Sequence, residues 1–101
     1  MKTNIQEQDG KTIVIFEGRL DTVVAADTAE TCKSLYDCKN QDIIIDCTKL
    51  EYIASSGLSI LFDILKNTQP NGCTIYIKGL SDDLREIFDI TGFTSFFKFT
   101  P

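Results

Sequence analysis

Apolar residues recur along this chain at two spacings, one typical of strands and one typical of helices. Short runs rich in β-branched residues predict strands over 12–17, 42–46 and 73–78. Between and after these runs, apolar residues return every three or four positions and predict helices over 24–36, 58–65 and 84–91. Strands that alternate with helices are typical of an α/β domain with a mostly parallel sheet.

Turn residues predict how the chain begins. Asp9-Gly10 is typical of a two-residue hairpin turn, because both positions of such a turn need a positive φ. A short first strand over 2–7 is therefore expected to pair antiparallel with the strand at 12–17. Gly18 is expected to end that second strand.

Three adjacent isoleucines and two cap residues complete the predicted fold. Ile43, Ile44 and Ile45 predict a strand that is buried on both faces. Ser81 suits the N-cap of the last helix, and Gly92 suits the position that closes it. A final strand or packed tail is expected around Phe93, Phe96, Phe97 and Phe99. Residues 1–101 are thus expected to form one α/β domain with a mostly parallel sheet of four to five strands, an N-terminal antiparallel hairpin, and helices packed on the sheet.

Composition narrows the classes of function. The chain is 43% hydrophobic and carries a net charge of −5 without a cluster of Lys or Arg, which argues against nucleic acid as a partner. No segment approaches the ~20 apolar residues of a membrane span, and the polar start lacks a signal peptide, so the expected location is the cytoplasm without membrane attachment. The chain has no histidine and no closely spaced cysteine pair, so neither a metal site nor a disulfide framework is expected from Cys32, Cys38, Cys47 and Cys73.

Three polar stretches follow predicted strands or precede a helix. They cover residues 18–22, 46–48 and 54–57, and they are expected to meet at the edge of the sheet where the parallel strands end. Ser55 and Ser56 both suit the N-cap of the second long helix. Gly57 weakens that helix and is easier to explain where another backbone or a partner approaches closely. Because no histidine can act as a base for either serine, catalysis is not expected.

Two motifs resemble a known family. The chain looks like a STAS domain, and more narrowly like the stand-alone anti-sigma factor antagonists. The segments that carry this likeness are Gly-Arg-Leu-Asp at 18–21 and Ile-Ile-Ile-Asp-Cys-Thr-Lys-Leu-Glu-Tyr-Ile-Ala-Ser-Ser-Gly-Leu at 43–58. The resemblance implies that Ser55 is phosphorylated by an anti-sigma factor with serine kinase activity and dephosphorylated by a serine phosphatase. It also implies regulation of transcription by partner switching, with no cofactor. The implied partner-binding residues are Asp21, Asp46, Thr48, Ser55, Ser56 and Gly57. The best-known members have an aspartate before the serine, where this chain has Ala54.

Two other functions are alternatives. The domain could be a STAS interaction subunit of a transporter or stress-signalling assembly, in which Ser55 is a helix cap and binding ignores phosphate. It could also be a small serine-dependent enzyme, which the missing histidine disfavours.

Overall fold

The computed structural model describes residues 1–100 and arranges them as one five-stranded sheet with flanking helices. The strands are β1 (Lys2–Gln8), β2 (Lys11–Leu20), β3 (Asp42–Ile53), β4 (Thr74–Lys78) and β5 (Lys98–Thr100). The α-helices are α1 (Thr22–Cys32), α2 (Ser55–Thr68) and α3 (Asp82–Thr91). Short 3-10 helices η1 (Lys33–Asp37), η2 (Gln69–Asn71) and η3 (Phe93–Phe96) lie between them.

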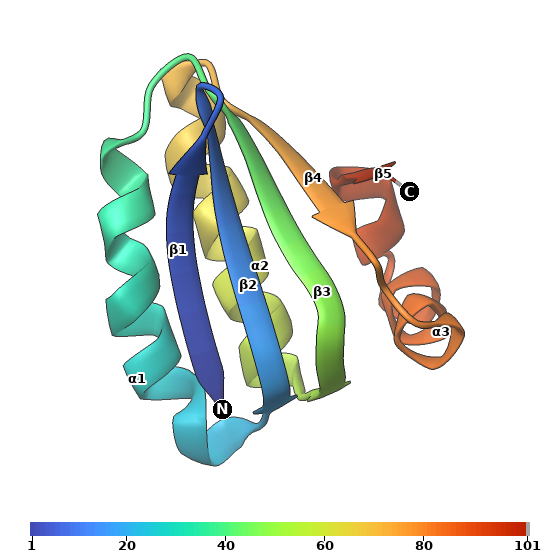
Figure 1. Ribbon diagram of the computed structural model, residues 1–101. Coiled ribbons are helices and arrows are strands. Elements are labelled where there is room, and N and C mark those ends of the chain that lie inside the picture. Colours follow the sequence, from blue (N-terminus) through green and yellow to red (C-terminus); the bar gives the residue numbers. More distant parts are fainter. Residues whose placement is uncertain (101) are drawn as a thin grey trace.

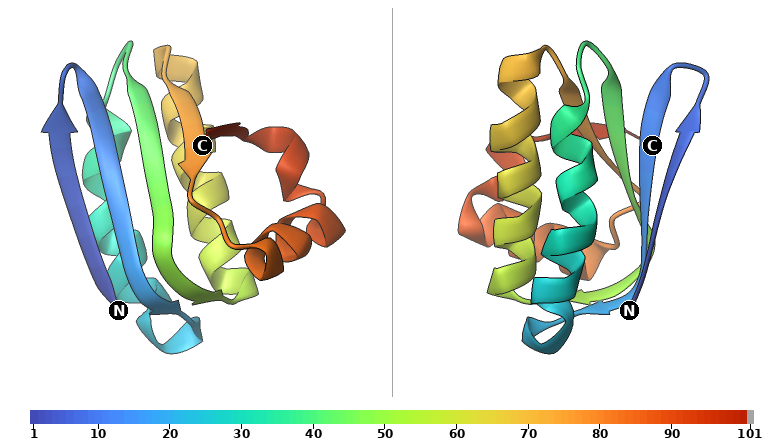
Figure 2. Two further views of the ribbon diagram at one scale, coloured as in Figure 1. Left: turned by 45° about the vertical axis from the view of Figure 1, so that its right-hand side comes forward. Right: turned by 90° about the vertical axis from the view of Figure 1, so that its left-hand side faces the viewer.

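The sheet follows the order of the chain, β1-β2-β3-β4-β5 (Figure 1). β1 pairs antiparallel with β2, and each later strand pairs parallel with the one before it. Helices α1 and α2 lie side by side over one face of this sheet, as the right-hand view of Figure 2 shows. The predicted α/β class, the hairpin and the mostly parallel sheet are therefore confirmed.

The core lies between the sheet and the two helices α1 and α2. Ile43 and Ile45 are fully buried on this side, whereas Ile44 is only half-buried on the opposite face. The prediction that all three isoleucines are buried was wrong, because α1 and α2 cover the same face of the sheet. α2 contributes the buried residues Leu58, Ile60, Leu61, Ile64 and Leu65.

The predicted turn and cap residues adopt the expected conformations. Asp9 and Gly10 have φ values of 53° and 77°, as a two-residue hairpin requires. The Ser81 hydroxyl accepts a hydrogen bond of 3.2 Å from the Leu84 N–H, and Gly92 ends α3 in the left-handed region with φ 80°. These local predictions are confirmed, and so is a last strand, β5, near the C-terminus.

Strands β2 and β3 are both longer than the sequence predicted. β2 passes through Gly18 to Leu20, and β3 passes Asp46 and ends at Ile53. The pairing of the two strands is irregular between Ile15 and Glu17 and again after Gly18. Such bulges let a strand carry extra residues and bend while pairing continues. The polar residues after Asp46 are thus part of a bent strand, and the expected ends at Gly18 and Asp46 were wrong (Figure 1).

Candidate functional site

The end of β2 and the start of α2 are held together by the backbone. Leu20 pairs with Ile53 in the strand register, and the Ala54 N–H donates a hydrogen bond of 2.9 Å to the Leu20 carbonyl. Asp21, the N-cap of helix α1, directly follows Leu20, and helix α2 starts directly after Ala54. The predicted meeting of residues 18–22 with residues 54–57 is therefore confirmed, at the lower end of the sheet in Figure 1.

Ser55 is exposed and does not cap its helix. Ala54 occupies the N-cap position with extended φ and ψ of −88° and 170°, and no side chain caps the first turn. The predicted capping by Ser55 or Ser56 was wrong, because the chain takes up extended geometry at Ala54 in order to bond Leu20. The Ser55 hydroxyl is consequently not committed to the helix. It lies at the positive end of the helix dipole, where a negative group is tolerated.

Ser56 differs from Ser55 in its surroundings. Its hydroxyl oxygen is buried and makes no hydrogen bond within residues 1–100. Burial of this oxygen leaves Ser55 as the serine of the pair that a second protein can reach.

Gly57 is buried where α2 presses on the end of β2. A Cβ atom at this position would lie 2.7 Å from Leu20 Cγ and 2.8 Å from Ile53 Cγ1, distances at which atoms overlap. The close approach predicted for Gly57 is therefore made by the protein's own core, and only glycine fits without movement of that core.

Asp21 lies in the same region and is engaged in capping. Its Oδ1 accepts hydrogen bonds from the N–H groups of Val23 and Val24, at 3.1 and 3.2 Å, and so starts α1. These contacts fix the Asp21 carboxylate at the edge where α2 also begins. Asp21 thus has a structural role that the sequence motif did not reveal.

Asp46 and Thr48 are not brought to Ser55. Asp46 pairs across the sheet with Ile15 and Lys78, and its Oδ1 accepts a hydrogen bond of 2.9 Å from the Thr48 N–H. Thr48 packs so closely against Gly79 that a Cβ there would overlap its hydroxyl. Because β3 rises about 3.3 Å per residue, its run from Asp46 to Ile53 separates these residues from Ser55. The prediction that all three polar stretches meet was wrong for residues 46–48.

Sequence reasoning gave no role to three exposed side chains at this end of the sheet. Arg19 and Tyr52 are partners in the strand register, and the guanidinium carbon lies 4.4 Å from the centre of the tyrosine ring. Val23, in the first turn of α1, is 87% exposed, which is unusual for a valine in a helix packed on a core. A helical wheel that starts at residue 22 would have placed Val23 on the solvent-exposed face of α1. The pairing of Arg19 with Tyr52, in contrast, depends on the bulge between β2 and β3 and could not be predicted from local sequence.

The buried thiols do not supply a nucleophile. Burial, with a smaller contribution from the Asp46 charge, raises the pKa of the Cys47 thiol to about 12. Burial also raises the pKa of Cys32 to about 11. Both groups are therefore protonated at neutral pH, whereas nucleophilic attack requires the thiolate. Across residues 1–100 no three metal-ligating side chains come together, and no helix of this part is long and apolar enough to cross a membrane.

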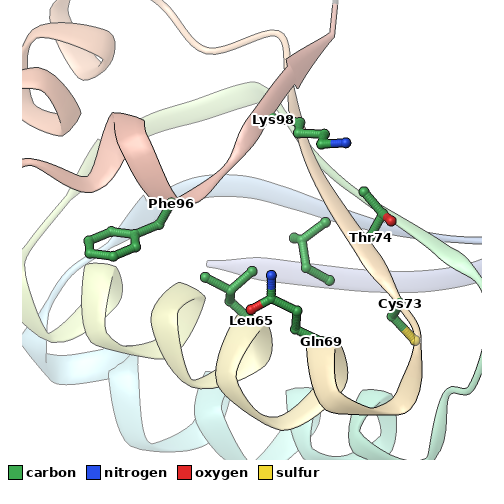
Figure 3. A pocket seen from close by; sticks show the side chains of 7 residues that line it. Leu65, Gln69, Cys73, Thr74, Phe96 and Lys98 are labelled. Atoms are coloured by element: carbon green, nitrogen blue, oxygen red, sulfur yellow. The ribbon is translucent and has the colours of Figure 1, made fainter.

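A cavity of about 160 Å³ lies far from Ser55 (Figure 3). It is lined by residues from α2, η2, β4, η3 and β5 and from the turn before β4, namely Leu65, Gln69, Cys73, Thr74, Ile75, Phe96 and Lys98. Because Leu65 lies about ten residues along α2 from Ser55, at about 1.5 Å of rise per residue, the cavity belongs to the opposite end of the helix. Ser55 therefore lies on the exposed surface of the protein and does not line this cavity.

Comparisons with known proteins agree with this architecture. The sequence matches the family model described as STAS domain over residues 2–101. The anti-sigma-B factor antagonist of Staphylococcus aureus is 30% identical over 94 residues, which cover 91% of this chain and 87% of that protein. The crystal structure of an anti-sigma factor antagonist from Mycobacterium paratuberculosis is similar with a TM-score of 0.81 at 23% identity, covering 99% of this chain and 85% of that chain. The Bacillus cell fate determinant SpoIIAA in its phosphorylated form is similar with a TM-score of 0.74 at 13% identity, covering 99% and 92%.

Proposed function

This chain belongs to the STAS domain family and is 30% identical to an anti-sigma-B factor antagonist over 91% of its length, and on that premise we propose that it is a phosphorylation-controlled antagonist of an anti-sigma factor. In its unphosphorylated form it binds an anti-sigma factor that is also a serine kinase, and the sigma factor is released. Phosphorylation of Ser55 ends that binding, and a serine phosphatase restores it. The proposed place of action is the cytoplasm, and the outcome is a change in transcription.

The observation that carries this proposal is that the Ser55 hydroxyl is exposed and does not cap helix α2. A cap serine would lose a helix-stabilising hydrogen bond when modified, at a cost of about 0.5–2 kcal/mol. Ser55 has no such bond to lose, because Ala54 occupies the cap position and Leu20 anchors it. Phosphate can therefore be added at this position without loss of the fold.

The chemistry of the modification explains how binding could end. Phosphate adds about −1.5 to −2 charges at neutral pH where a neutral hydroxyl was. Asp21 already contributes a carboxylate to the same edge. A partner surface that fits the neutral serine then meets a bulky group and a stronger negative field, and each loss of about 1.4 kcal/mol weakens binding tenfold.

The fold comparison gives independent support. A structure of SpoIIAA in its phosphorylated form has this fold, so such a domain can carry phosphate and remain folded. Asp46 and Thr48 are proposed to contact the partner only if its surface extends along β3 toward Lys78, since they lie away from Ser55. Ser56 and Gly57 are proposed to support the serine through packing, because both are largely covered.

The test compares four forms of the protein as bait in lysate of the source organism: unmodified, Ser55→Ala, Ser55→Asp, and Ser59→Asp. Ser59 is exposed on α2 one turn after Ser55, and its hydroxyl donates a hydrogen bond of 3.1 Å to the Ser55 carbonyl. Ser59→Asp therefore controls for a negative charge added next to Ser55 but not on its hydroxyl. We expect the unmodified, Ser55→Ala and Ser59→Asp forms to retain an anti-sigma factor with a kinase domain, identified by mass spectrometry, and Ser55→Asp to lose it. Phosphopeptide mapping should find phosphate on Ser55.

Two outcomes would contradict the proposal. Equal retention of one partner by all four forms, with no phosphate on Ser55, would indicate a STAS interaction subunit without a phosphoswitch. Unfolding of Ser55→Asp in a denaturant melt would show that Ser55 is structural, since a surface change of this kind should alter stability by only about 0.5 kcal/mol.

A further inference from the structure

We infer that Arg19 is the internal counter-charge for phosphate on Ser55, so that phosphorylation draws its guanidinium away from the Tyr52 ring. This inference rests on the proposed function, since it concerns the same serine. It gives a role to Arg19, a member of the Gly-Arg-Leu-Asp motif to which neither the resemblance nor the comparisons assign one.

The strand register pairs Arg19 with a residue three positions before the serine. Arg19 pairs with Tyr52 across β2 and β3, and the next pair, Leu20 and Ile53, is followed directly by the hydrogen bond from Ala54 to Leu20. Paired strands lie about 4.8 Å apart, and the three steps from Tyr52 to Ser55 span at most about 10 Å. The guanidinium already leans over β3, because it lies 4.4 Å from the centre of the Tyr52 ring. Leu20 and Ile53 face Gly57 of α2, so Arg19 and Tyr52, which alternate with them, project from the other face of the sheet. The inferred contact requires the guanidinium to turn around the ends of β2 and β3 toward Ser55, where the chain passes from β3 into α2.

The Arg19 guanidinium is free to move. Arg19 is exposed, and the ion pairs found among residues 1–100 join Lys33 to Glu30, Lys66 to Asp63, and Arg85 to Asp89. Arg85 offers a contrast, because it stacks on Phe99 and is also held by Asp89. The Arg19 stack on Tyr52 has no such second contact within residues 1–100.

A phosphate is a better partner for Arg19 than the tyrosine ring is. Contacts between an exposed cation and an aromatic ring are weak, because water solvates the cation well. A phosphate dianion accepts two parallel, charge-assisted hydrogen bonds from the planar guanidinium. Phosphorylation therefore favours transfer of Arg19 from the ring to the phosphate.

The other charged side chains at the ends of β2 and β3 do not replace Arg19. Asp21 and Glu51 are negative and would repel a phosphate, and Asp21 is fixed by its bonds to α1. Lys49 lies farther back along β3, where its register partner is Glu17. The first turn of α2 adds only a partial positive charge.

The transfer changes the surface in two ways at once. The phosphate adds negative charge. The guanidinium also leaves the face of the Tyr52 ring, and Tyr52 is already 38% exposed in the unmodified protein. A partner that contacts Arg19 stacked on Tyr52 loses that contact on phosphorylation. The arginine thus couples the state of Ser55 to a patch of β2 and β3 three residues away.

The experiment uses protein with phosphoserine installed at position 55 by genetic-code expansion, so that no kinase is needed. The pKa of the phosphate is measured by 31P NMR titration in the parent, Arg19→Gln, Arg19→Lys and Lys49→Gln proteins. Lys49→Gln is the matched control, since it removes an exposed cation from the same strand pair. A nearby cation stabilises the dianion, so the parent phosphate should titrate about 0.5–1 pH unit below that of Arg19→Gln. Lys49→Gln should titrate with the parent, and Arg19→Lys between the two.

The Tyr52 ring signals give a second, independent readout. Phosphorylation should shift them in the parent protein, because the guanidinium leaves the ring, and should leave them nearly unchanged in Arg19→Gln. Equal phosphate titrations in the parent and Arg19→Gln proteins would overturn the inference. Failure of the proposed function is recognised separately, as an absence of Ser55 phosphorylation or of a phosphate-dependent partner in the lysate experiment.

Discussion

Replacement of Gly57 by alanine adds one methyl group at the tightest contact between α2 and the sheet. The new Cβ would lie 2.7 Å from Leu20 Cγ and 2.8 Å from Ile53 Cγ1, and both neighbours are buried, at 0% and 3% exposure. Overpacking of a core by one carbon costs about 1–3 kcal/mol, and alanine returns up to about 1 kcal/mol through its better helix propensity. We expect a net loss of about 1–2 kcal/mol, which lowers the melting temperature of a domain of this size by about 5–10 °C.

The assay is urea denaturation followed by circular dichroism, with Ser59→Ala as an exposed control on the same helix. The origin of the loss is tested in a Leu20→Ala background, where the space beside Gly57 is open and Ile53 can also shift. There Gly57→Ala should cost much less, with a coupling energy of about 1 kcal/mol or more between the two sites. Effects that add to within about 0.5 kcal/mol, or an unchanged stability of Gly57→Ala, would refute the packing explanation of this glycine.

Three further predictions test the fold and its ionisation. Leu61→Ala removes a fully buried side chain of α2 and should cost about 2–5 kcal/mol in urea melts, whereas exposed Lys66→Ala should be nearly neutral. Ser81→Ala removes the hydrogen bond that caps α3 and should cost about 1 kcal/mol; a threonine at this position should retain most of the stability. The Cys47 thiol is buried and its pKa is raised from 9.0 to about 12, so the folded protein keeps a proton that the unfolded chain loses. Stability should therefore fall as the pH rises from about 9 toward 12, and the fall should be shallower in Cys47→Ala; parallel pH profiles of the two proteins would contradict this.

Short-range patterns predicted much of the fold. The Asp9-Gly10 turn, the Ser81 cap and the Gly92 terminus were each readable from a few neighbouring residues, and each is confirmed. The alternation of strand-like and helix-like spacing also predicted the order of the elements and the parallel sheet. The prediction of strand ends was wrong where it relied on neighbouring residues, because the ends are set by pairing with a strand far away in the sequence. Gly18 and Asp46 look like strand ends, but the pairing of β2 with β3 carries both strands past them.

The same distinction between local sequence and distant contacts applies to the candidate site. The sequence by itself determined that a serine pair begins a helix and resembles the phosphorylated site of a STAS domain, because motif and amphipathic spacing are properties of neighbouring residues. Only the tertiary structure decided which residues surround that serine. The bond from Ala54 to Leu20 makes alanine the cap and leaves Ser55 free, and the bulged register places Arg19 on Tyr52 and leaves Asp46 behind. The physical reason is that a strand's register, and each bulge in it, is set by pairing and core packing over the whole sheet.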